Sequence, residues 1–174
     1  MKATPSNAYQ EFDRRFLHAS TWAERKDGVP LELLDNLSPE EKQTAEDALI
    51  RRLSTGDDWP ARGLGHLRSQ KARGRLRQLL SKSEGTVRAA TALAVWQIDG
   101  DPQMGDELVE LSRSNYTDDS KSMKTFTMID IIWCLVGVSL ASTAARLEEL
   151  TRSKNHFVST NANRAIKLRR TGKL

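Results

Sequence analysis

The stretch that decides the fold is residues 87–114, which read VRAATALAVWQIDGDPQMGDELVELSRS. Its first half is rich in small and apolar side chains, which let a helix pack closely against its neighbours. Asp101 and Pro102 then interrupt this pattern, and leucines follow at Leu108 and Leu111. Leucines three residues apart mark one face of a helix. The stretch therefore predicts two helices joined by a tight turn.

The leucine motif of the second helix occurs three times in the chain. Residues 76–83 read LRQLLSKS, residues 108–114 read LVELSRS and residues 147–153 read LEELTRS. The copies are roughly 31 and then 39 residues apart, and the longer step contains the polar insertion 114–122. One helix pair cannot bury its own apolar face, but three or more stacked pairs share a continuous core. The spacing thus predicts stacked helical hairpins.

An apolar helix is expected before each leucine motif, over residues 60–67, 87–98 and 128–138, and a fourth is expected over residues 159–168. The second helices are expected at about 71–82, 102–113 and 141–152.

The N-terminal part follows a different pattern. Ser38 followed by Pro39 and two glutamates is typical of a helix start, and predicts a helix that ends near Leu53. Residues 7–20 and 29–37 are expected to form further helices that cap this end of the stack.

Residues 57–153 resemble HEAT repeats of the lyase-associated type. The match lies in Val87-Arg88, in the small residues that follow, in Asp101-Pro102 and in the leucine-rich second helix, whereas Trp96 stands where the family usually has glycine. The resemblance implies an all-α fold, a short right-handed α-solenoid of about three to four HEAT-like helical hairpins. We expect a single domain over 1–174, with an N-terminal helical cap at 1–56 and the repeats at 57–174.

The formal net charge of +4 conceals an alternating pattern. The net charge is −4 over residues 1–60, +7 over 61–90, −6 over 91–120 and +7 over 121–174. In a stacked fold such segments lie side by side and form charged bands. Bands of both signs favour a protein partner through electrostatic complementarity. The basic residues at 68–82 fit three roles: phosphate contact, pairing with the partner, or pairing with the chain's own acidic band at 99–119.

Residue types that carry chemistry are sparse. His18, His66 and His156 have no second histidine or cysteine at metal-ligand spacing, and the His-Glu motifs of the di-iron HEAT hydroxylases do not occur. Cys134 lies in an apolar run, which predicts a buried, unreactive thiol. We therefore expect no enzyme activity, no catalytic residues, no metal and no cofactor. The first residues lack the apolar segment of a secretory signal, and the apolar stretch 128–140 is too short to span a bilayer, so we expect a cytoplasmic protein without a membrane partner.

These observations favour a protein-binding module, and small bacterial proteins of this kind are often immunity proteins that neutralise a co-encoded toxin by direct contact. The partner-binding residues we expect are charged or aromatic and lie on the second helices and the insertion: Arg73, Arg77, Asp106, Glu110, Tyr116, Asp118 and Asp119.

Two other functions remain open from the sequence. A nucleic-acid-binding protein similar to the HEAT-like alkylpurine glycosylases would use aromatic and acidic residues such as Trp133 and Asp130. An accessory scaffold for bilin attachment would share the repeat type with the bilin lyases. The tryptophans Trp22, Trp59, Trp96 and Trp133 fit either core packing or exposed binding anchors.

Overall fold

The computed structural model describes residues 5–172, and every regular element in this range is a helix. The prediction of an all-α fold is confirmed. Three short helices come first, namely α1 (Asn7–Phe12), α2 (Trp22–Arg25) and α3 (Glu32–Asp35). Eight longer helices follow: α4 (Pro39–Arg52), α5 (Trp59–His66), α6 (Arg73–Leu80), α7 (Gly85–Asp99), α8 (Gln103–Ser114), α9 (Met123–Val136), α10 (Ala141–Leu150) and α11 (His156–Thr171). Residues 1–4 of the expected N-terminal cap and residues 173–174 of the expected repeats lie outside the described residues.

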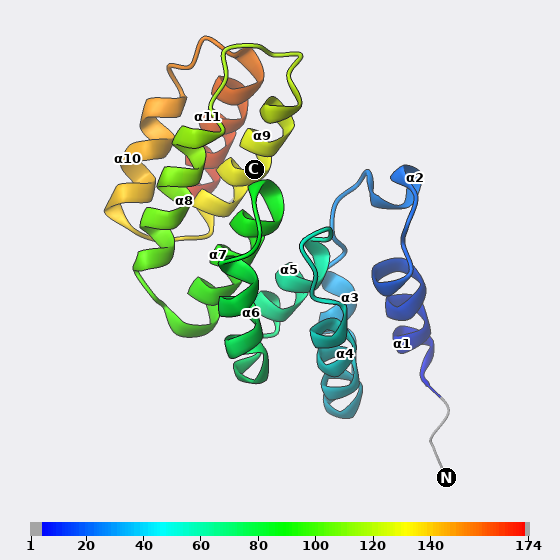
Figure 1. The fold of residues 1–174 in the computed structure, drawn as a ribbon. Coiled ribbons are helices and arrows are strands. Elements are labelled where there is room, and N and C mark those ends of the chain that lie inside the picture. The colour runs from blue at the N-terminus through cyan, green and yellow to red at the C-terminus, as the bar shows by residue number, and fades with distance from the viewer. Residues whose placement is uncertain (1–4, 173–174) are drawn as a thin grey trace.

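The longer helices pack in the order of the chain (Figure 1). Helix α5 packs against α7, α7 against α9, and α9 against α11, so that the four apolar helices expected from the sequence are successive neighbours. Helix α8 contacts α7 and α9, while α10 contacts α9 and α11. Helix α6 contacts α7, so each helix that carries a leucine motif packs against at least one of the apolar helices.

The leucine motifs form the buried face of these helices, as the three-residue spacing predicts. The first leucine of each motif, at Leu76, Leu108 and Leu147, is fully buried, and the second is nearly so. Burial of each leucine side chain contributes about 1.5–3 kcal/mol relative to an exposed position. The motif therefore recurs because each copy packs one helix against the core.

Helix α4 begins where the sequence predicts. The Ser38 hydroxyl accepts a hydrogen bond from the backbone N–H of Glu41, and the Glu41 carboxylate accepts one from the Ser38 N–H. Glu41 also accepts a hydrogen bond from the Ser6 N–H at 3.0 Å. Hydrogen bonding lowers the pKa of Glu41, first through the Ser6 side chain and then through the backbone N–H groups of Ser38 and Ser6. The capping box thus ties the start of α1 to the start of α4.

The N-terminal cap is less regular than expected. The helix predicted over 7–20 ends at Leu17, and its last turn, Asp13–Leu17, is a π-helix. The helix predicted over 29–37 shrinks to α3, because a residue before proline disfavours the helical conformation and Pro30 follows Val29. The short α2 was not predicted; it begins at a capping box between Thr21 and Glu24.

The four tryptophans have three different environments. Trp59 is buried, with its ring 5.7 Å from that of Phe16 and the Arg25 guanidinium 4.1 Å above it. Trp96 and Trp133 are half-buried and Trp22 is 80% exposed. Core packing therefore accounts fully for Trp59 and in part for Trp96.

Candidate functional site

The arginines expected to bind a partner on α6 are engaged within the chain. The Arg73 Nε donates to Asp99 at 2.9 Å, and Arg77 donates to Asp99 at 2.9 Å and to Asp101 at 2.8 Å. The hydrogen bond from Arg77 is the largest cause of a lowered pKa at Asp101. Of the three roles open to this basic segment, pairing with the acidic band is the one seen for Arg73 and Arg77.

Other residues of the basic segment differ in their pairing. Lys71 pairs with Asp47, and Arg88 pairs with Glu107 at 2.5 Å. Within residues 5–172, three exposed cations of this segment form no ion pair: Arg68, Arg75 and Lys82.

The acidic residues expected on α8 are exposed. Glu110 lies 3.8 Å from Arg113 one turn further on, and Asp106 forms no ion pair with any residue of the described range. Surface ion pairs of this kind contribute about 0–1 kcal/mol, so both carboxylates stay accessible to a partner.

The insertion between α8 and α9 folds onto the turn between α10 and α11. The Tyr116 hydroxyl donates to Asp118 at 2.6 Å and lies 3.1 Å from the Ser153 hydroxyl. The Asp119 carboxylate accepts a hydrogen bond from the backbone N–H of Lys121. Tyr116, Asp118 and Asp119 therefore shape the insertion, and Tyr116 itself is half-buried.

Asn155 joins the insertion to two helix starts. Its buried side-chain amide donates to the Thr117 carbonyl at 3.2 Å and to the Thr125 hydroxyl at 2.9 Å. Its carbonyl oxygen accepts from the backbone N–H groups of Phe157 and Val158, which caps α11. The sequence alone did not reveal this residue, because its partners are 30 and 38 residues away.

We expect Asn155→Ala to lower the free energy of unfolding by about 2 kcal/mol, because it removes a helix cap and leaves a buried hydroxyl and a carbonyl without their donor. Urea denaturation followed by circular dichroism measures this loss. Asn163→Ala is the matched control, since the exposed Asn163 amide bonds only within α11. Equal stability of the two variants would contradict the role of Asn155.

Large apolar side chains are exposed where α9 and α11 begin. Met123 is 77% exposed, Phe126 59% and Phe157 51%. The hydrogen bond from Asn155 to Thr125 holds the two helix starts together. In Figure 1 the insertion and the α10–α11 turn lie at the same end of the stack. We call this end, made of residues 113–126 and 152–157, the loop edge.

A groove of about 280 Å³ on the loop edge is rich in arginine. Arg146 donates to Glu149 at 2.7 Å and to the Ser112 hydroxyl at 2.7 Å, which fixes its guanidinium. The hydrogen bond from Arg146 is the largest cause of a lowered pKa at Glu149, and Arg113 and Arg152 lower it further. One carboxylate thus faces three arginines. The lining residues are Arg113, Tyr116, Arg146, Glu149, Leu150, Arg152 and Ser153.

A second charge cluster lies between α5, α7 and α9. The Arg62 Nε donates to Asp58 at 2.5 Å, and the Thr86 hydroxyl donates to Asp130 at 3.0 Å. Burial raises the pKa of Asp130, while Arg62 opposes that rise. Trp133 lies one turn beyond Asp130 and is half-buried. The cluster shows how Asp130 is accommodated in the most apolar helix: the Thr86 hydroxyl donates a hydrogen bond to it, and the positive charge of Arg62 favours its ionised form.

Cys134 is fully buried beside this cluster, as the sequence predicts. Burial raises the pKa of its thiol to about 11. At pH 8 only about one thiol in a thousand is then ionised, so we expect the native protein to react with a disulfide reagent such as DTNB at least a hundredfold more slowly than the protein in 8 M urea. Rapid labelling of the native protein would show that the thiol is accessible.

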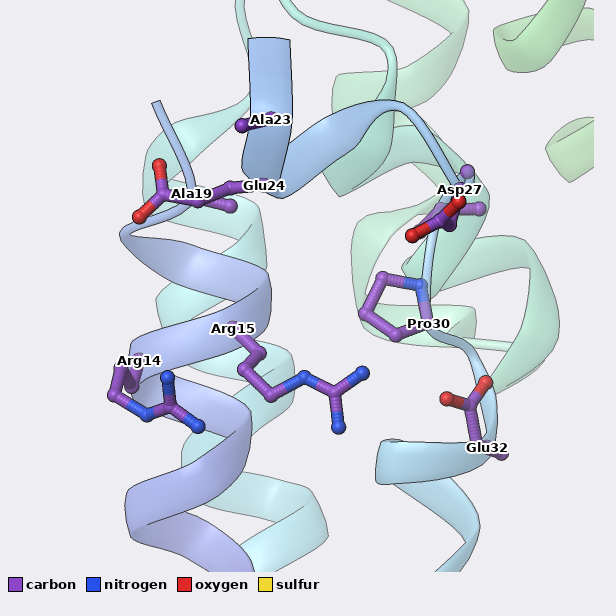
Figure 2. Close-up of a pocket in the computed structure, with 10 residues that line it drawn as sticks. Arg14, Arg15, Ala19, Ala23, Glu24, Asp27, Pro30 and Glu32 are labelled. Carbon is purple, nitrogen blue, oxygen red and sulfur yellow. The ribbon is translucent and has the colours of Figure 1, made fainter. Parts of the chain in front are cut away.

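A cleft of about 370 Å³ lies in the N-terminal cap (Figure 2). Arg15 extends across it toward the wall that carries Pro30 and Glu32. Arg15 pairs with Glu11 at 2.8 Å, and the Glu24 carboxylate accepts hydrogen bonds from the Thr21 backbone N–H and hydroxyl. Two of the five charged groups that line this cleft are thus engaged by their own chain, whereas Arg14, Asp27 and Glu32 form no ion pair or side-chain hydrogen bond within residues 5–172.

Two of the three histidines lie beside carboxylates. His66 Nε2 lies 2.7 Å from Asp35, and His18 lies beside Asp13 and Arg52. Among residues 5–172, no group of three or more histidine, cysteine, aspartate or glutamate side chains is arranged to hold a metal ion. No helix in the described range has the length and apolar character needed to cross a bilayer.

Comparison with known proteins gave no match to a family model, to a curated protein or to a solved structure.

Proposed function

We propose that this chain is a short right-handed α-solenoid of HEAT-like hairpins that binds a partner protein and does not catalyse a reaction. The successive packing of α5, α7, α9 and α11, with one leucine-motif helix after each of the first three, supports the solenoid. In this proposal residues 57–174 form the repeats and residues 1–56 the cap. A stack of this kind presents an extended surface, and the outer side chains that do not pack against the core are free to specify the partner.

The observation that carries the binding role is the exposure of Met123, Phe126 and Phe157 on two adjoining helix starts. Scattered single apolar residues are normal on a protein surface, whereas neighbouring ones are typical of interaction sites. Aromatic residues and methionine are enriched in protein–protein interfaces. The hydrogen bonds of Asn155 hold this group in place before any partner arrives, which reduces the entropic cost of binding.

The specific role we propose is that of an immunity protein, which neutralises a toxin encoded beside it by covering the toxin's active site or substrate path. Such an inhibitor acts where the toxin is made, in the cytoplasm. Tight inhibition needs apolar anchors within a charged surround, and both occur on this surface.

Co-expression tests this role directly. The product of the adjacent gene is induced in a neutral host, alone and together with this chain, and growth is recorded. We expect growth arrest without the chain and normal growth with it. Arrest that persists in the presence of equal amounts of folded chain, or no arrest at all, would contradict the immunity role.

A further inference from the structure

We propose that the loop edge docks an acidic surface of the partner protein, with an apolar side chain of the partner seated against Phe126 and Phe157. This inference rests on the proposed protein-binding function and names the face of the chain and the chemistry of the partner.

The loop edge is one continuous surface. The Tyr116 hydroxyl and Ser153 link the insertion to the α10–α11 turn, and Asn155 links both to the start of α9. Phe126 follows Thr125, which Asn155 contacts, and Phe157 donates its backbone N–H to the same asparagine. Both phenylalanines therefore stand at helix starts that the same asparagine joins.

The charge of this surface is positive. Four exposed cations on it form no ion pair with any residue of the described range: Lys121, Lys124, Arg152 and Lys154. Two carboxylates lie on it, Asp118 and Asp119, and their hydrogen-bond donors are the neutral Tyr116 hydroxyl and Lys121 backbone N–H, so four unpaired cations stand against two negative charges. This excess of positive charge favours an acidic partner surface through electrostatic complementarity.

The arginine-rich groove supplies a place for one acidic side chain. Arg146 is fixed by the Ser112 hydroxyl and by its pair with Glu149, whereas Arg152 has no such pair and lines the same groove. A carboxylate entering beside Arg152 gains charge-assisted hydrogen bonds without rearranging Arg146.

The exposed apolar residues favour a protein over a nucleic acid. Bases stack on aromatic faces along a groove that follows the phosphate backbone. Here Met123, the most exposed of the three apolar residues, stands one helical turn before Phe126, and such a pair is suited to an aliphatic or aromatic side chain.

Site-specific photo-cross-linking tests the inference in cells of the native host. A benzoylphenylalanine residue replaces Phe126 on the loop edge, Gln78 on α6 or Gln43 on α4, all of which are exposed. We expect a discrete protein adduct at position 126, identified by mass spectrometry, and none at the other two.

The adducts separate the two proposals. A protein adduct at position 78 or 43 but not at 126 would overturn the loop edge and leave the binding function standing. An adduct with nucleic acid at 126 would overturn the acidic-protein proposal, and no adduct at any position would overturn both.

Titration of the purified, captured protein then tests the charge argument. Lys124→Glu with Arg152→Glu is expected to raise Kd at least about tenfold, and 0.5 M NaCl is expected to weaken wild-type binding. The control is Arg75→Glu with Lys82→Glu. Lys82 holds the place in its leucine motif that Arg152 holds in another copy, and both Arg75 and Lys82 are exposed and unpaired within residues 5–172. Equal Kd values for the two double variants would overturn the proposal.

Discussion

Replacement of Arg62 with alanine is expected to lower the free energy of unfolding by about 3 kcal/mol. The side chain of Arg62 is 17% exposed and donates to Asp58, which is 18% exposed. Removing one partner of a buried ion pair costs about 3–5 kcal/mol. The residual exposure of Arg62 and the second cation near Asp58, Arg25 at 3.8 Å, place the loss at the lower end. Urea denaturation at pH 7, followed by circular dichroism, measures it.

The pH dependence of this loss identifies its cause. In the native protein Arg62 opposes the rise that burial imposes on the pKa of Asp130. Without Arg62 that pKa rises further above its unfolded value, so the folded variant binds a proton more tightly than the unfolded chain. Stability of Arg62→Ala relative to wild type is therefore expected to recover as the pH falls from 7 to 5. A loss that is equal at both values would contradict the electrostatic explanation.

The second large effect is expected at Gly65, where α5 and α7 approach most closely. A Cβ added at Gly65 would lie 2.8 Å from the Ala94 Cα, and a backbone atom cannot move aside as a flexible side chain does. We expect Gly65→Ala to lower the free energy of unfolding by about 2–3 kcal/mol, although alanine alone favours a helix by about 1 kcal/mol. Thermal and urea denaturation both report this loss.

Gly74→Ala is the matched control for this prediction. Gly74 also lies in a helix, but nothing stands within 4 Å of an added Cβ. We expect this variant to be as stable as wild type or more stable, by up to about 1 kcal/mol. A stable Gly65→Ala protein would show that α5 and α7 do not pack as closely as described.

The helices that carry the leucine motifs were the part of the fold most open to prediction from sequence. Leu76, Leu108 and Leu147 lie on buried helical faces because a periodic pattern reports burial directly. The N-terminal cap was less predictable, since its short helices depend on local features. A capping box at Thr21 begins α2, and Pro30 delays α3, so that neither forms a long periodic segment.

The candidate site was predicted only in part. Arg73 and Arg77 were recognised as a charged group, but the sequence left open whether they pair with a partner or with Asp99 and Asp101. Phe126 was hidden because it stands beside the most apolar run of the chain, where exposed and buried apolar residues have the same composition. Exposure at that position is a property of helix packing, which one sequence does not display.

The central claim is that this chain works by binding a protein. Its most direct test is to mix the purified chain with the purified product of the adjacent gene and to measure the molar mass by size-exclusion chromatography with light scattering. The same chain is titrated with a 20-base-pair DNA duplex at low and high salt. We expect a complex of defined stoichiometry with the protein and at most weak DNA binding. Separate elution of the two proteins, together with tight DNA binding that falls steeply with salt, would contradict it.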